Sequence, residues 1–263
     1  MTEKTAAILA IGDELLSGRT RDANIHYLGS WLGERAVALK EARIVADEIG
    51  AIAKALNHLR AEYDYVFTSG GIGPTHDDIT ADGVAAAFGV DVVENPEALA
   101  LIQKWYDKLG QEVTPARRRM ARMPQGATMI FNPVTGAPGV RVENVFVMAG
   151  VPRIFQGMLG GVEAELERGV QIYSLAVTAD NLPESVLADQ LREIQAALKN
   201  VSIGSYPIDG DVKGVTVIAR SESEATAQAA IVSVSAAIRA LGVEPKEGDH
   251  ADARRDAASA DEA

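Results

Sequence analysis

The chain has 263 residues, of which 47 % are hydrophobic, and a formal net charge of −12. This length predicts one or two domains with a sizeable buried core. The acidic balance makes nucleic acid and anionic membranes poor general partners. The sequence contains no cysteine, which excludes disulfides, thiolate catalysis and cysteine-ligated zinc.

The apolar run near the amino terminus is short. Residues 6–11 are too few to span a bilayer or to form the hydrophobic region of a signal peptide. We therefore expect a cytoplasmic protein without a membrane partner.

Strand patterns alternate with helical patterns over the first 170 residues or so. Strands are expected at residues 5–11, 37–45, 63–67, 127–131 and 144–148. Helices are expected at residues 22–34, 48–61, 80–88, 96–109 and 115–122, and from Pro152 to about Arg168. This rhythm predicts an α/β fold, in which a mostly parallel sheet lies between two layers of helices.

A second unit is expected to begin at about residue 170. Strand patterns at 172–179, 201–206 and 214–220, with helical patterns at 184–199 and 222–241, give a βαββα order. This order suits a small α+β domain. We therefore expect one domain over residues 1–169 and a second over 170–243. Residues 244–263 are acidic and alanine-rich with almost no large apolar residues, which predicts a disordered tail.

A glycine-rich loop, TSGGIGPTHDDIT at residues 68–80, joins an expected buried strand to an expected helix. Gly70, Gly71 and Gly73 allow positive φ and a close approach of a ligand to the backbone. The following helix would point its free N–H groups at the same place, which suits an anion. We assign these glycines, together with Ser69 and Thr75, to a phosphate site. A purely structural strand-to-helix turn is the alternative.

Two pairs of acidic residues follow the first and third expected strands. In doubly wound sheets these strands are usually neighbours, and ligands bind outside their carboxyl ends. Asp13 and Glu14 would then meet Asp77 and Asp78 across one crevice. Four carboxylates can bind Mg²⁺ or a similar hard cation, which could clamp a pyrophosphate and activate water. The alternative for Asp13 and Glu14 is a helix cap with first-turn charge.

A basic cluster lies farther along the chain. Arg117, Arg118, Arg119 and Arg122 could reach phosphates, although a solvated or oligomer-facing helix explains them more simply.

Four motifs occur together and in a fixed order: GDELLSG at 12–18, GGIGPTHDDIT at 70–80, NPVTGAPG at 132–139 and GVP at 150–152. Together they resemble the molybdopterin-binding (MoaB/Mog-like) domain, in the branch found in CinA, the competence/damage-inducible protein A, and in the front domain of eukaryotic FAD synthases. The resemblance covers residues 4–168, and residues 171–242 are similar to the small domain that follows there. It implies a three-layer α/β/α fold with a nucleotide- or pterin-phosphate site. We add Gly12, Thr135 and Gly136 to that site.

The resemblance also implies an activity. In the CinA branch it implies hydrolysis of ADP-ribose or FAD-like pyrophosphates with a divalent metal (Mg²⁺, Mn²⁺ or Co²⁺), for which Asp77 and Asp78 are the catalytic candidates. In the molybdenum-cofactor branch the fold binds molybdopterin, and the acid equivalent to Asp78 is associated with adenylyl transfer. The carboxy-terminal amidohydrolase domain of full-length CinA has no counterpart here, so deamidation of nicotinamide nucleotide is not expected.

Two motifs depart from the CinA pattern. Thr135 and Gly136 are interchanged, and an expected Leu-Pro before Gly150 is replaced by Met148 and Ala149. These departures bear on the substrate more than on the fold.

We therefore expect a metal-dependent nucleotide pyrophosphatase. The alternatives are a molybdopterin-binding protein of molybdenum cofactor biosynthesis and a nucleotide-binding module without turnover. We expect a homo-oligomer whose partner is a small nucleotide or pterin phosphate, and no nucleic acid.

Overall fold

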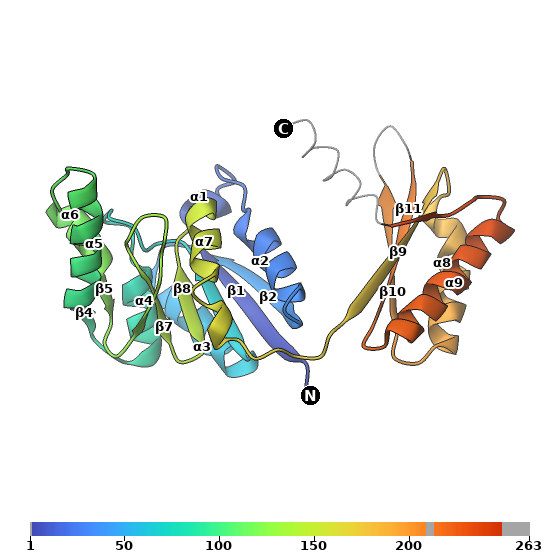
Figure 1. Ribbon diagram of the computed structural model, residues 1–263, viewed down its shortest axis with the longest axis horizontal. Coiled ribbons are helices and arrows are strands. Elements are labelled where there is room, and N and C mark those ends of the chain that lie inside the picture. Colours follow the sequence, from blue (N-terminus) through green and yellow to red (C-terminus); the bar gives the residue numbers. More distant parts are fainter. Residues whose placement is uncertain (1, 209–212, 249–263) are drawn as a thin grey trace. The chain divides into compact units, whose positions relative to one another are not determined.

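The computed structural model describes residues 2–208 and 213–248. The chain divides into two compact units, with the boundary between Val170 and Gln171 (Figure 1). Among the described residues, no helix combines the length and the apolar character needed to cross a bilayer.

The first unit contains a six-stranded sheet in the order β2-β1-β3-β8-β7-β6. Strand β1 pairs in parallel with β2 and β3, and β3 pairs in parallel with β8, whereas β7 and β6 are antiparallel additions at one edge. The predicted mostly parallel sheet, with neighbouring first and third strands, is confirmed. The strand bounds are Lys4–Ile11 (β1), Val37–Val45 (β2), Tyr65–Ser69 (β3), Thr128–Ile130 (β6), Gly139–Val142 (β7) and Val145–Met148 (β8).

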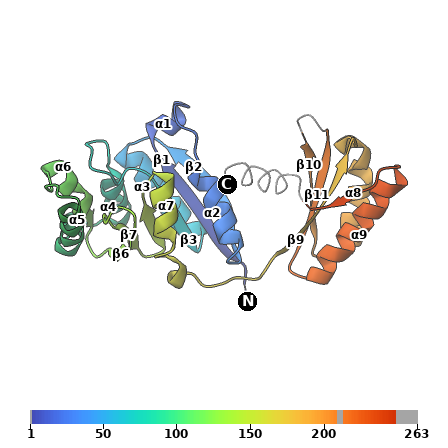
Figure 2. The same ribbon diagram turned by 45° about the horizontal axis from the view of Figure 1, so that its top comes forward.

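Helices cover both faces of this sheet (Figures 1 and 2). One core contains Ala7, Leu9 and Ile11 of β1 and is covered by α3, α4 and α5; the other contains Ala6 and Ile8 and is covered by α2 and α7. Successive strand side chains point to opposite faces, so a strand buried on both sides must be apolar throughout. The three-layer prediction is confirmed. The helix bounds are Asn24–Gly33 (α2), Ile49–Glu62 (α3), Thr80–Phe88 (α4), Pro96–Lys108 (α5) and Pro152–Leu159 (α7).

Two predicted helices are shorter in the structure. The helix expected at 115–122 ends at Arg118 (α6, Pro115–Arg118), continues as a 3₁₀ turn, Arg119–Ala121, and becomes strand β5, Arg122–Pro124. Strand β5 pairs with β4, Val92–Glu94, and this pairing requires an extended backbone where the helix was expected to continue. Helix α7 ends at Leu159, before Gly160 and Gly161, rather than near Arg168. Glycine disfavours helix continuation, and two in a row end it.

The second unit is a four-stranded antiparallel sheet in the order β10-β11-β9-β12. Helices α8 and α9 pack on one face and share a core with Val177, Val215 and Val217. The bounds are Tyr173–Asp180 (β9), Glu184–Ala197 (α8), Ser202–Ile208 (β10), Gly214–Ser221 (β11), Glu224–Ala240 (α9) and Lys246–Glu247 (β12).

The start of the expected disordered tail is ordered instead. Lys246 and Glu247 pair with β9, the N–H of Gly248 donates to the carbonyl of Ala176 at 3.0 Å, and Lys246 forms an ion pair with Asp180. Composition alone mispredicts residues 244–248, because an open strand edge can hold a segment through backbone hydrogen bonds without apolar side chains. Residues 249–263, the rest of that predicted tail, lie outside the described residues.

Candidate functional site

A cavity of about 550 Å³, called the main cavity below, opens beyond the carboxyl ends of β1, β3 and β8. This is where a parallel sheet is expected to hold a ligand. Its lining comes from the loop after β3, the loop after β8, the region after β1 and neighbouring segments. The lining residues are Glu14, Thr20, Gly70, Gly71, Ile72, Gly73, Pro74, Asp78, Tyr106, Met120, Asn132, Thr135, Ala137, Ala149, Gly150, Val151, Pro152 and Ile154.

The loop after β3 needs glycine at two positions. Gly70 has φ +111° and Gly71 has φ +65°. A Cβ at Gly70 would lie 2.2 Å from the carbonyl oxygen of Ile11, and one at Gly71 would lie 2.2 Å from the hydroxyl of Thr80. Only glycine is free of both conflicts. The loop therefore brings bare backbone to the floor of the main cavity.

Thr80, the first residue of helix α4, holds this loop in shape. Its hydroxyl donates to the carbonyl of Gly70 at 2.9 Å, and its backbone N–H donates to the carbonyl of Gly71 at 3.0 Å. The first N–H of α4 is therefore used by the loop itself, although the sequence argument had reserved it for a ligand.

Asn24 ties three parts of the site together. Its side-chain amide donates to the hydroxyl of Ser69 at 2.7 Å and to the carbonyl of Gly150 at 2.8 Å. Asn24 and Ser69 are both buried, so Ser69 supports the floor and does not line the main cavity. The sequence did not single out Asn24 as a support. Asp22 accepts a hydrogen bond from the N–H of Ile25 at 2.8 Å at the start of this helix. The side chain of Asn24 is therefore not needed there and is available for another role.

Two of the four predicted metal-binding carboxylates reach the main cavity and two do not. Glu14 and Asp78 line the main cavity, whereas Asp13 and Asp77 are exposed and do not. In the described part of the chain, no three acidic or histidine side chains are grouped as a metal site. Neighbouring residues in a turn point in different directions, so each of the two acidic pairs contributes only one carboxylate to the main cavity.

Asp78 is held in place by Thr75, a residue that the sequence had also assigned to the site. The backbone N–H of Thr75 donates to Oδ2 of Asp78 at 2.7 Å, and its hydroxyl donates to the same atom at 2.5 Å. Thr75 is exposed and does not line the main cavity. Thr75 therefore orients Asp78, and a hydrogen bond from its side chain also lowers the pKa of Asp77. The sequence had assigned Thr75 to the phosphate.

Asp47 is an acidic residue that the sequence analysis did not find. It accepts a hydrogen bond from the backbone N–H of Asp13 at 2.9 Å. Burial raises its pKa above the ordinary 3.8, and the nearby negative charges of Asp13, Glu14 and Asp77 raise the pKa further. The negative charges around Asp47 therefore disfavour its own ionised form.

Asp47→Asn is expected to raise the melting temperature by a few degrees at neutral pH. The folded-state pKa of Asp47 is raised, so its charged form costs folding free energy above that pKa. The gain should shrink as pH falls through the raised pKa and vanish below 3.8, where the aspartate is protonated in both states. Asparagine still offers an acceptor to the N–H of Asp13. Thermal melting of both proteins across this pH range checks the prediction, and a lower melting temperature for the variant at neutral pH would contradict it.

The other predicted site residues fall in different places. Thr135 lines the main cavity, and its hydroxyl accepts from the buried amide of Asn132 at 2.7 Å. Gly136, at φ +71°, packs against Trp105 and lines a separate hollow of about 210 Å³. Gly12 is buried and lines neither of these cavities.

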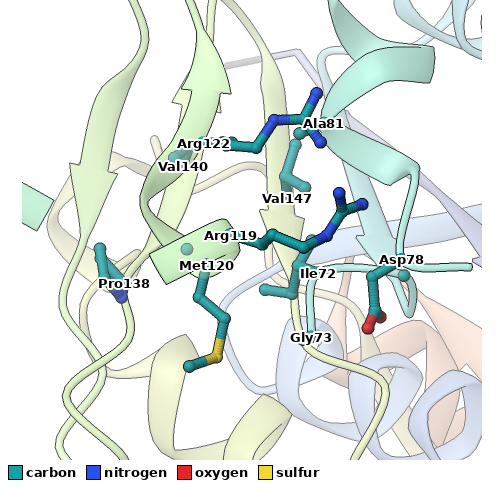
Figure 3. A pocket seen from close by; sticks show the side chains of 12 residues that line it. Ile72, Gly73, Asp78, Ala81, Arg119, Met120, Arg122, Pro138, Val140 and Val147 are labelled. Atoms are coloured by element: carbon teal, nitrogen blue, oxygen red, sulfur yellow. The ribbon is translucent and has the colours of Figure 1, made fainter. Parts of the chain in front are cut away.

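A narrow cavity of about 30 Å³ adjoins the main cavity. Two of the predicted arginines, Arg119 and Arg122, line it from the segment where α6 gives way to β5 (Figure 3). A continuous helix over 115–122 would have left them on a surface. The early end of the helix goes with the pairing of β5 with a distant strand, which the local sequence does not reveal.

Comparison with known proteins identifies the family. Residues 7–168 match the family model described as "Probable molybdopterin binding domain". The chain belongs to this molybdopterin-binding domain family. Residues 173–247 match the FAD synthase middle domain, so the predicted resemblance is confirmed over both units.

Two relatives of this protein align with nearly its whole chain. A protein from Pyrobaculum aerophilum is 33 % identical over 94 % of this chain and 97 % of its own length. A protein from Aeropyrum pernix is 32 % identical over 93 % and 97 %. The crystal structure of CinA from Thermoplasma acidophilum, described as having unknown function, matches 62 % of this chain and 97 % of that chain, with 35 % identity and a TM-score of 0.57.

Proposed function

We propose that this chain is a binding protein for a phosphorylated pterin or nucleotide, with a role in molybdenum cofactor biosynthesis. The observation that carries the proposal is the main cavity itself. Its volume of about 550 Å³ falls within the range of roughly 300–1,000 Å³ that is typical of small-molecule sites, and its floor is the bare backbone of Gly70 and Gly71.

The walls of the main cavity suit a flat heteroaromatic ring. Tyr106, Met120 and Ile154 supply apolar surface, while Thr20 and Thr135 supply a few polar groups. This mixture is what ligand sites use, since apolar contact gives affinity and a few polar groups fix orientation. The molybdopterin-binding domain match supports a pterin, and the FAD synthase middle-domain match supports a nucleotide.

Titration calorimetry tests the proposal with molybdopterin, ADP, ADP-ribose and FAD, and with adenosine as the ligand without phosphate. At least one phosphorylated ligand is expected to bind, and adenosine is expected to bind at least about tenfold more weakly than ADP, a difference of about 1.4 kcal/mol. Absence of binding by all four phosphorylated ligands would overturn it.

A second candidate function is hydrolysis of a dinucleotide pyrophosphate. Glu14 and Asp78 line the same cavity, and carboxylate oxygens are the ligands that hard divalent cations prefer. Water and ligand phosphate would have to complete the coordination, because no third carboxylate of the described residues lines the main cavity. A cation bound there would offset the charge developing on a pyrophosphate.

A screen for AMP release from ADP-ribose and FAD with Mg²⁺, Mn²⁺ or Co²⁺ separates the two candidates. Product formation with a cation supports the hydrolase. Binding without product under all three cations leaves the binding protein.

We further propose that the protein works as a cytoplasmic homo-oligomer. The cysteine-free sequence suits a reducing compartment. Light scattering measures the assembly directly.

A further inference from the structure

The arginines near the main cavity differ in what they bind. Arg118 donates two hydrogen bonds to the carboxylate of Glu94, at 2.5 and 2.6 Å. Arg122 donates to Asp82 at 2.6 Å. Arg117 donates to a backbone carbonyl and to a glutamine side chain, both at 2.6 Å. These three side chains are therefore held by protein groups.

Arg119 is different. Among the described residues, no hydrogen bond or ion pair reaches its side chain, and its Nε is buried without an acceptor. A buried donor without an acceptor costs folding free energy, and a charged one costs more. An acceptor that comes from outside the chain would remove this cost.

The side chain of Arg119 lines the narrow cavity that adjoins the main cavity. The two cavities share the lining residues Gly71, Ile72, Gly73, Asp78 and Met120. In Figure 3, Arg119 and Arg122 extend in the same direction across this hollow, with Ile72, Gly73 and Asp78 beneath them. A ligand in the main cavity can therefore place one of its groups beside Arg119.

The size of the narrow cavity restricts that group. Its 30 Å³ holds about two water-sized groups, at roughly 10–15 Å³ each. A pterin or purine ring cannot enter, whereas the oxygens of a phosphoryl group can. A guanidinium suits this role because its planar fork matches phosphate oxygens and it keeps its charge at any physiological pH.

We propose that the narrow cavity is an anion subsite, in which Arg119 binds the terminal phosphoryl group of a ligand whose remainder lies in the main cavity. This inference rests on the proposed function for the rest of the ligand. With one phosphate on the backbone of Gly70 and Gly71 and the next beside Arg119, the ligand class is a diphosphate rather than a monophosphate. The positive charge of Arg119 is needed to bind an anion here, because the chain carries a net charge of −12 and Asp78 lies beside the subsite.

Thermal melting with inorganic pyrophosphate tests the subsite without a nucleoside. Pyrophosphate is expected to raise the melting temperature of the wild type and of Arg118→Met, but not of Arg119→Met. Arg118 is the matched control, since it is a neighbouring arginine held by Glu94 on the surface. Without pyrophosphate, Arg119→Met should melt no lower than the wild type, because methionine keeps an apolar stem and removes the unsatisfied donor.

Calorimetry with ADP and AMP then tests the ligand class. The wild type should bind ADP at least about tenfold more tightly than AMP, Arg119→Met should lose this preference, and Arg119→Lys should keep part of it through its charge. An equal pyrophosphate response in Arg119→Met, or a marked loss of its stability without pyrophosphate, would overturn the subsite. If pyrophosphate binds through Arg119 but no pterin or nucleotide binds, the subsite stands and the proposed function falls.

Discussion

Gly71→Val is expected to abolish ligand binding in the main cavity, with a loss of affinity of at least about 100-fold, or about 2.7 kcal/mol. The added Cβ would lie 2.2 Å from the hydroxyl of Thr80, at a backbone φ of +65° that valine strongly disfavours. Thr80 holds the carbonyl of Gly70 in place, so any movement that relieves this clash also moves the floor of the cavity. Calorimetry with ADP measures the loss.

Gly89→Val is the matched control for this variant. Gly89 also has φ +65°, but it lies at the other end of α4, and a Cβ there meets no atom within 4 Å. This control therefore carries the backbone strain alone, of order 1–3 kcal/mol. Its melting temperature should fall while its affinity for ADP stays unchanged. Unchanged affinity in Gly71→Val would place the ligand elsewhere in the protein.

The fold could be predicted from the sequence where the signal is local. Strand β2 and helix α4 have the predicted bounds, because each is defined by its own apolar pattern. Strands β4 and β5 were not predicted. They contain three residues each and pair Val92 with Pro124 across a long stretch of chain, so their order comes from tertiary contacts rather than propensity.

The site divides in the same way. The need for glycine at Gly70 and Gly71 is a backbone property that a strand-loop-helix pattern reveals. The direction in which a carboxylate points is not revealed by such a pattern. Asp78 reaches the main cavity and Asp77 does not, although the two residues are adjacent in the sequence. The position of Arg119 beside the narrow cavity depends on the end of α6 at Arg118, and that end depends on the pairing of β4 with β5. No local pattern could have separated Arg119 from its neighbours.

Asp78→Asn is expected to remove any dependence of ligand affinity and turnover on a divalent cation, while the fold survives. The asparagine oxygen can accept both hydrogen bonds that Thr75 now donates, at 2.7 and 2.5 Å, so the loop keeps its shape. The variant loses one of the two carboxylates that line the main cavity, and a hard cation is then held by Glu14 alone. Any turnover should fall by orders of magnitude. Without a cation, affinity for ADP should rise or stay equal, since a like charge is gone.

Asp77→Asn is the matched control, because it removes the same charge at the adjacent residue. The side chain of Asp77 is exposed and lines neither cavity. Calorimetry with ADP, with and without Mg²⁺, and thermal melting are run on both variants. The cation response should persist in Asp77→Asn and disappear in Asp78→Asn. Equal losses in both would show that the total charge of the loop matters, and would revive a wider acidic site. A full Mg²⁺ response in Asp78→Asn would mean that Asp78 holds no cation, which removes the structural support for the hydrolase and leaves the binding protein.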